Sequence, residues 1–209
     1  FVGHPFVRRN WQSPFRYESD APVLLLPGSR SAAVARIFPL LLAGFRKARE
    51  SKPALKATVV YPSAKIRDLL ESVLATQPDL AQQIEFVSNK TENLPGSAVL
   101  MSSGTMSLGC ALSGIPGAIA YRLNPMSYWI GRLLVKVKYI GIANLLLDRP
   151  LHPEFIQSAA SPAQLSLQLL RALDQTESAV EAQDGAVELR ELLHAGNDAS
   201  AADWLARGL

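Results

Sequence analysis

The sequence predicts an α/β fold in which helices cover both faces of a parallel β-sheet. Short apolar runs rich in β-branched residues alternate along the chain with longer amphipathic segments. This alternation is typical of parallel strands joined by crossover helices. Hydrophobic residues make up 48% of the 209 residues and charged residues 19%, so the chain can build a sizeable buried core.

The first half of the chain contains two strand-and-helix units. The run Val23–Leu26 predicts a buried strand, and a helical pattern follows over residues 31–50. Pro39 lies inside this pattern and should kink the helix or split off its first turn. The run Ala57–Tyr61 predicts a second strand, which is followed by a helix near residues 64–76.

Three further strands are predicted at residues 83–87, 98–101 and Gly117–Tyr121. After the last of them, Asn124 and Pro125 predict an N-cap and the first position of a helix. Apolar residues then follow at the spacing of one helical stripe as far as residue 137.

The C-terminal part predicts helices alone. Pro162 should open one helix, and residues 178–209 predict one or two polar helices broken near Gly196 and Asn197. This tail is too polar to be buried on all sides, so it should lie on the outside of the fold. The predicted domains are a linker-like segment at 1–22, an α/β domain at 23–160 and a helical tail at 161–209.

Residue usage excludes several classes of protein. A single cysteine, Cys110, excludes an internal disulfide framework and fits a reducing compartment. No run has the spacing of metal ligands, no GxSxG turn is present, and no basic strand carries interleaved aromatics, so neither a metal nor a nucleic acid is expected. The first residues lack the pattern of a signal peptide, and no apolar run reaches the roughly 20 residues of a membrane span.

Charge is distributed unevenly, although the net charge is only +3. No Asp or Glu occurs between Glu92 and Asp148, whereas this stretch carries basic residues at Arg122, Arg132, Lys136 and Lys138. Such a segment suits an anionic ligand or an anionic membrane surface. A parallel-sheet core with few charges would give the same pattern.

The most informative motif is the turn after the first strand. Pro27 ends the strand, Gly28 turns the chain, and Ser29 and Arg30 stand at the mouth of the following helix. A helix N-terminus offers free N–H groups and a partial positive charge, and a guanidinium matches phosphate oxygens. The motif predicts a phosphorylated ligand.

A second glycine turn follows the strand predicted at 98–101. Ser103, Gly104 and Thr105 offer hydroxyl and N–H groups at the same sheet edge, although this triplet is also an ordinary helix N-cap. Two such turns at one edge favour a nucleotide site. Neither turn matches a P-loop or the GxGxxG fingerprint, so ATP hydrolysis and nicotinamide cofactors are disfavoured.

Residues 128–139 combine aromatic, aliphatic and basic side chains. Interfacial helices have this mixture, and Trp129, Arg132 and Lys136 would then contact a membrane surface. An amphipathic helix packed on its own sheet, with its cations solvated, would show the same spacing.

Five segments, in this order, resemble the C-terminal half of bacterial lipid-A-disaccharide synthase. They are FVGHP, LLLPGSR, LMSSGTMSLGCAL, GIPGAIAYRLNPMSYWIGRLLVKVKYIGIANLL and HPEFIQ, and the resemblance covers about residues 1–160. It implies the C-terminal half of a GT-B fold, so that residues 23–160 form a Rossmann-like domain that binds a nucleotide sugar. In this family an N-terminal domain supplies the acceptor site and the catalytic acid/base.

The implied reaction joins UDP-diacylglucosamine to diacylglucosamine 1-phosphate and releases UDP at the cytoplasmic face of the inner membrane, without a bound metal or organic cofactor. The implied partners are therefore a UDP-sugar donor and an acylated glucosamine phosphate. The residues that match the family's donor side are Gly28, Ser29, Arg30, Ser103, Gly104, Thr105, Tyr121, Arg122, Asn144 and Gln157.

Two positions depart from the family pattern. Ala33 and Gly109 stand where the family usually has Glu, and in related UDP-sugar enzymes such a carboxylate accepts the ribose hydroxyls. Alternative functions are therefore a diverged, non-catalytic binding module, or another UDP-sugar enzyme of the epimerase or peptidoglycan-glycosyltransferase type.

Overall fold

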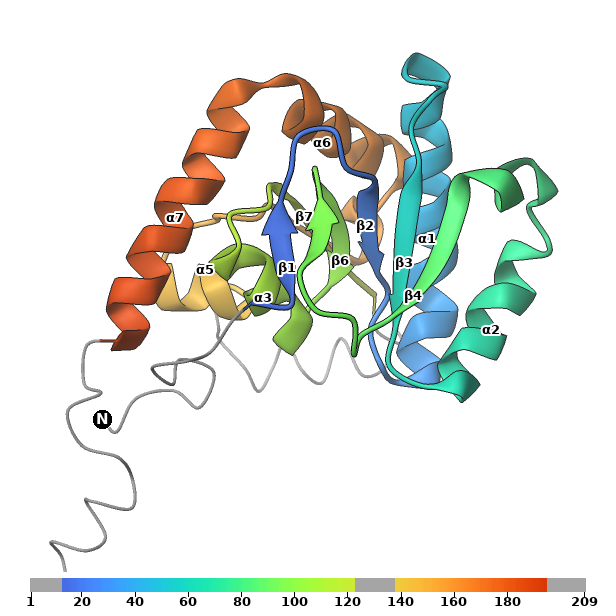
Figure 1. The fold of residues 1–209 in the computed structure, drawn as a ribbon, viewed down its shortest axis with the longest axis horizontal. Coiled ribbons are helices and arrows are strands. Elements are labelled where there is room, and N and C mark those ends of the chain that lie inside the picture. The colour runs from blue at the N-terminus through green and yellow to red at the C-terminus, as the bar shows by residue number, and fades with distance from the viewer. Residues whose placement is uncertain (1–12, 123–137, 195–209) are drawn as a thin grey trace, which may run out of the picture.

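The computed structural model describes residues 13–122 and 138–194. A six-stranded sheet forms the centre of this part of the chain, and all its neighbouring strands are parallel (Figure 1). In spatial order the strands are β4 (Ile84–Ser88), β3 (Ala57–Tyr61), β2 (Val23–Leu26), β6 (Val99–Ser102), β7 (Gly117–Tyr121) and β8 (Glu154–Ile156).

The predicted α/β class and parallel pairing are confirmed. Three predicted strands have the same bounds in the structure, namely β2, β3 and β7, and β4 and β6 are each displaced by one residue. The chain runs from β2 outward to β3 and β4, and then returns to the other side of β2 for β6, β7 and β8. This reversal places a topological switch point between β2 and β6, where ligands bind in open α/β sheets.

The helices pack on both faces of the sheet. One face is covered by α1 (Ser31–Ser51), α2 (Ala64–Leu74) and α6 (Pro162–Asp174), and the other by α3 (Thr105–Leu112), on which α5 (Ile142–Leu147) and α7 (Thr176–His194) pack. Short 3-10 turns precede β4 (Pro78–Gln83) and follow β8 (Gln157–Ala159).

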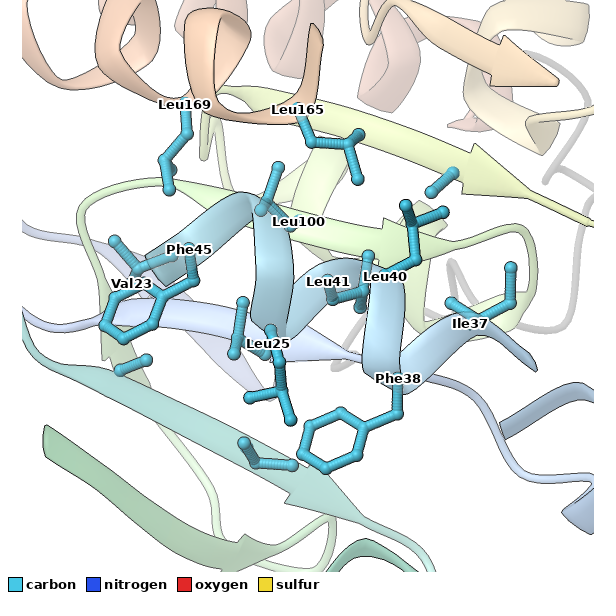
Figure 2. Packing of buried hydrophobic residues seen from close by; sticks show 14 of the residues in the cluster. Val23, Leu25, Ile37, Phe38, Leu40, Leu41, Phe45, Leu100, Leu165 and Leu169 are labelled. Atoms are coloured by element: carbon cyan, nitrogen blue, oxygen red, sulfur yellow. The ribbon is translucent and has the colours of Figure 1, made fainter. Parts of the chain in front are cut away.

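Alternate residues of the buried strands point to opposite faces, as the two-residue period of a strand requires. Leu25 of β2 packs with α1 in the larger cluster, whereas Leu24 and Leu26 belong to the cluster on the α3 side. Figure 2 shows Phe38 and Phe45 of α1 in the larger cluster, and Leu165 and Leu169 of α6 in the same cluster. Both phenylalanine side chains are fully buried.

Helix α1 is continuous, although Pro39 lies inside it. Of the two outcomes predicted for Pro39, a kink or a split, the split of the first turn does not occur. Proline lacks the N–H that would bond to the carbonyl of Ala35. Ala35 is exposed, so water can satisfy that carbonyl and the helix can pass the proline without ending.

The N-terminal segment contains structure that the sequence did not predict. Strand β1 (Phe15–Tyr17) pairs in parallel with β5 (Leu94–Gly96) in a second, two-stranded sheet. The Ser113 hydroxyl lies 2.8 Å from the carbonyl oxygens of both Phe15 and Gly109, and its single proton can bond to either, so it links β1 to the end of α3. Residues 13–17 of the linker-like segment are thus part of the fold.

The C-terminal helices cover the fold from outside, as predicted. Pro162 is the first residue of α6, and the Ser161 hydroxyl caps this helix by accepting from the N–H of Gln164 at 3.3 Å. Leu165 and Leu169 of α6 are fully buried against α1. The helix predicted after Pro125 and the break predicted near Gly196 lie outside the described residues, and the three predicted domain boundaries stay predictions.

A glycine at the contact between α1 and α6 leads to a stability prediction. A Cβ on Gly44 would lie 2.8 Å from the Cβ of Leu165. Gly44→Ala should therefore lower the free energy of unfolding by about 1–2 kcal/mol, because this overpacking outweighs the gain in helix propensity of about 1 kcal/mol. Urea unfolding measures the change, and a stabilised variant would contradict the close approach of the two helices.

Candidate functional site

A cavity of about 520 Å³ lies at the carboxyl ends of the strands, at the switch point between β2 and β6. Residues at the ends of β2, β6 and β7 line it, together with the first turns of α1. Eight of the ten predicted site residues are on its wall: Gly28, Ser29, Arg30, Ser103, Gly104, Thr105, Tyr121 and Arg122. The structure therefore brings together two turns that are more than 70 residues apart in the sequence.

The first turn has the geometry that a phosphate site needs. Gly28 has φ +103°, and a Cβ there would lie 2.9 Å from the Ser102 hydroxyl of β6. Glycine thus permits both the backbone conformation and the close approach of the two turns. The first helical bonds of α1 are donated by Ala33 and Val34 to the carbonyl of Arg30. The N–H groups before them stand outside the helix ladder, at the positive end of a 21-residue helix.

The cavity carries positive charge without a neutralising acid. Arg30, Arg36 and Arg122 line it, and no Asp, Glu or His is among its lining residues in the part of the chain that the structure describes. Arg122 donates to the Ala160 carbonyl at 2.9 Å, which holds its guanidinium beside β7. Arg30 and Arg36 are exposed, and neither forms an ion pair with a described residue.

Arg36 also lines the cavity, and sequence reasoning did not single it out. It lies on the face of α1 that lines the cavity with Ala32, Ala33 and Ile37. The signal was present in the sequence, since these positions are i, i+1, i+4 and i+5 of one helix and share a face. No motif included it, because that face carries no other charged side chain.

The second turn is at once a helix start and a cavity wall. Gly104 is the N-cap of α3, and the Ser107 hydroxyl donates to its carbonyl at 2.5 Å. The Ser103 hydroxyl donates to the Ile140 carbonyl at 2.7 Å, so its proton serves the fold rather than a ligand. Thr105 is exposed on the wall.

Asn144 and Gln157 are not among the residues that line the cavity. Asn144 is fully buried, and its amide donates to the His152 carbonyl at 2.6 Å and accepts from the His152 N–H at 3.0 Å. Gln157 is half-buried at the start of the turn after β8, with φ +53°. Asn144 therefore supports the fold behind the site and does not reach its wall.

Glu154 is a further residue that sequence reasoning did not single out. Its carboxylate accepts from the N–H groups of Ile140 and Gly141 at 2.9 and 2.8 Å, and from the Asn144 amide at 2.8 Å. Because Ser103 donates to the carbonyl of the same Ile140, Glu154 and Asn144 position the segment that contacts the second turn. The segment HPEFIQ by itself does not predict this role for Glu154.

His152 makes stability depend on pH. Its ring is buried, Nε2 donates to the Ile115 carbonyl at 2.8 Å, and Nδ1 has no partner among the described residues. Burial lowers the pKa of His152 below its usual value, and the bond to Ile115 opposes this only in part. Below about pH 6.5 the unfolded chain therefore binds a proton that the folded chain does not.

The free energy of unfolding should fall as the pH decreases below about 6.5, by up to about 1.4 kcal/mol per pH unit from this group. Urea unfolding at pH 7.5, 6.5 and 5.5 measures the slope. His152→Gln keeps a donor for Ile115 and removes the titration, so its slope should be flatter. An unchanged slope in the variant would assign the pH dependence to other groups.

A smaller apolar cavity of about 170 Å³ adjoins the main one and shares Asn89, Thr105 and Met106 with it. Phe15 of β1 and Gly109 of α3 are on its wall, and a Cβ on Gly109 would lie 3.4 Å from the Phe15 ring. Ala33 lines the main cavity. Both departures from the family pattern are thus at cavity walls, and a side chain at position 109 would share its space with Phe15.

Other kinds of site are not found in the described part of the chain. No group of three or more His, Cys, Asp or Glu is placed to hold a metal ion within residues 13–122 and 138–194. In the same ranges no helix has the length and apolar character needed to cross a membrane. Cys110 is buried, and desolvation raises the pKa of its thiol, which keeps it protonated. Trp129, Arg132 and Lys136 lie outside the described residues.

The fold is that of one half of a GT-B glycosyltransferase. A mutant of S. aureus TarM, solved in complex with Fondaparinux, alpha-GlcNAc-glycerol and UDP, matches with a TM-score of 0.54 at 14% identity over 95% of this chain and 36% of its own. The pneumococcal O-GlcNAc transferase GtfA, in complex with UDP and GlcNAc, matches with a TM-score of 0.51 at 13% identity over 88% of this chain and 36% of its own.

The chain belongs to the lipid-A-disaccharide synthetase family, whose model matches residues 1–206. The lipid-A-disaccharide synthase of Rhodospirillum centenum is 32% identical over 94% of this chain and 51% of its own length. That of Salmonella agona is 32% identical over 86% of this chain and 47% of its own. The chain spans about half the length of these relatives.

Proposed function

We propose that this chain is the donor-binding part of a UDP-sugar-dependent glycosyltransferase. The reaction would join UDP-diacylglucosamine to diacylglucosamine 1-phosphate, form the lipid A disaccharide and release UDP at the cytoplasmic face of the inner membrane. The observation that carries the proposal is the acid-free cavity at the switch point, in which the Gly28 turn, the start of α1 and Arg30 meet the Ser103 turn. The family of the chain supports the choice of substrates.

The proposed reaction requires positive groups that stabilise a diphosphate, and the cavity contains such groups. Transfer of the sugar leaves a diphosphate that gains negative charge as the glycosidic bond to phosphate breaks. Fixed dipoles and cations aimed at that position stabilise the developing charge without rearranging. In this chain the positive end of α1 and the Arg30 guanidinium would bind the diphosphate, and Arg122 also lines the cavity. The group that activates the acceptor hydroxyl would come from the other half of a GT-B enzyme.

Titration with UDP tests the proposal directly. Amide NMR signals of the first turn, near Arg30, and of the second turn, near Ser103, should shift together and saturate with one affinity. Glucose at the same concentration is the control for non-specific effects. If UDP leaves both turns unperturbed, the proposed donor site is wrong.

A second candidate is a binding module without turnover. Ala33 and Gly109 favour it, because both are at cavity walls where the family usually has Glu. The two candidates differ in the products that the full-length protein forms from UDP-diacylglucosamine and the acceptor. Formation of the disaccharide supports the transferase, whereas UDP binding without any product supports the module. A UDP-linked sugar of altered configuration would indicate an epimerase, and transfer to a peptidoglycan-type acceptor would indicate that class of glycosyltransferase.

A further inference from the structure

We propose that the same cavity binds a second anionic group, a phosphate monoester, and that Arg36 holds it beside the nucleotide. This inference rests on the proposed function, because the diphosphate of the nucleotide is assigned there to Arg30 and the start of α1. The acceptor of the proposed reaction carries a phosphate monoester, so the proposal favours it as the source. Its phosphate would reach Arg36 while the other half of a GT-B enzyme holds the rest of the acceptor.

The position of Arg36 separates it from the diphosphate turn. Arg30 is the N-cap of α1, and Arg36 lies six residues further along the helix, which is about 9 Å along its axis. Both line the cavity of about 520 Å³. The backbone of Arg36 therefore lies more than one turn beyond the first N–H groups of the helix, at which a diphosphate would bind.

The surroundings of Arg36 leave its charge available. The helix face between it and the turn consists of Ala32 and Ala33, whose methyl groups do not shield the guanidinium or bond to it. A carboxylate at position 33 would be three residues from Arg36 on the same helix, at the spacing of an ion pair. With alanine there, and no acid on the wall within the described residues, the guanidinium faces the cavity unpaired.

The assignment of the diphosphate to Arg30 and the start of α1 also leaves a further guanidinium group for a second anion. Three guanidinium groups, from Arg30, Arg36 and Arg122, line one cavity without a carboxylate among the described residues. A guanidinium binds phosphate oxygens through paired N–H donors, and such charge-assisted bonds are about twice as strong as neutral ones. A nucleotide diphosphate held at the turn would use the first of these groups, and a second phosphate would use Arg36.

Arg46 provides a matched comparison on the same helix. Its guanidinium donates to Asp79 at 2.7 Å, and it does not line the cavity. If Arg36 were an ordinary solvated arginine, replacing it should have no more effect on ligands than replacing Arg46. The two substitutions remove the same side chain from the same helix, so they separate a site residue from a surface cation.

The experiment titrates glucosamine 1-phosphate into the 209-residue chain saturated with UDP, followed by calorimetry. We expect binding to the wild-type chain, a loss of at least fivefold in Arg36→Ala, a smaller loss in Arg36→Lys, and no change in Arg46→Ala. The affinity of Arg36→Ala for UDP alone should stay within twofold of wild type. Glucosamine without phosphate should not bind. If inorganic phosphate binds as tightly as glucosamine 1-phosphate, the anion site at Arg36 is supported and its ligand is free phosphate.

Two results would overturn the inference while the proposed function stands. In the first, UDP binds, but glucosamine 1-phosphate either binds to neither wild type nor Arg36→Ala or binds to both with equal affinity. In the second, Arg36→Ala loses UDP affinity tenfold or more, which would make Arg36 part of the diphosphate site. A chain that does not bind UDP at all would contradict the proposed function itself.

Discussion

Replacing Arg30 with alanine should weaken the binding of UDP about 10- to 100-fold. Arg30 lines the cavity at the N-terminus of α1 and forms no ion pair with a described residue, so its guanidinium is free to meet the diphosphate. A hydrogen bond to a charged group contributes about 1.5–3 kcal/mol, and each 1.4 kcal/mol corresponds to a factor of ten in affinity. Calorimetric titration of the 209-residue chain with UDP measures the loss.

Two further variants locate the cause of that loss. Arg30→Lys keeps the charge but lacks the planar pair of donors, so its affinity should lie between wild type and Arg30→Ala. Arg46→Ala removes an arginine of α1 that is paired with Asp79 away from the cavity, and it should bind UDP as wild type does. If Arg30→Ala binds UDP with an affinity within twofold of wild type, the diphosphate does not bind at this turn.

The central strands of the sheet were predictable from the sequence because they are buried on both faces, whereas the half-buried, three-residue strand β8 was not predicted. Each of β2, β3 and β7 is a short apolar run whose neighbours are helical, and such runs have few other places in a fold. The two glycine turns were predictable for the same reason, since parallel strands bring their carboxyl ends to one edge. The local sequence thus predicted where on the sheet the candidate site lies.

What the sequence could not predict depends on pairing between distant segments. Strands β1 and β5 have three residues each, too few for periodicity, and they form because each supplies the other's hydrogen bonds. Asn144 and Glu154 look alike from sequence as polar residues of a motif. Only their neighbours show that they satisfy buried backbone groups instead of a ligand. Arg36 was missed because no motif includes it, and only the fold shows that its helix face lines the cavity.

Replacing Asn144 with aspartate should lower the free energy of unfolding by about 3 kcal/mol at pH 7. The amide donates to the His152 carbonyl and to the Glu154 carboxylate, and an aspartate would face both with acceptors only. A buried charge that loses its partner, or meets a like charge, costs about that much. Urea unfolding measures the loss, and faster amide exchange of Ile140 and Gly141 should accompany it.

The destabilisation of Asn144→Asp should depend on pH, which distinguishes charge repulsion from lost packing. Two carboxylates in contact raise the pKa of the pair in the folded state above the value in the unfolded chain. The folded variant then binds a proton more readily than the unfolded chain, so its deficit relative to wild type should shrink as the pH falls from 7 toward 5. Asn144→Leu removes the same hydrogen bonds without adding a charge, and its deficit should not change with pH. If the two variants showed the same pH dependence, the Glu154 carboxylate would not be the partner that Asn144 serves.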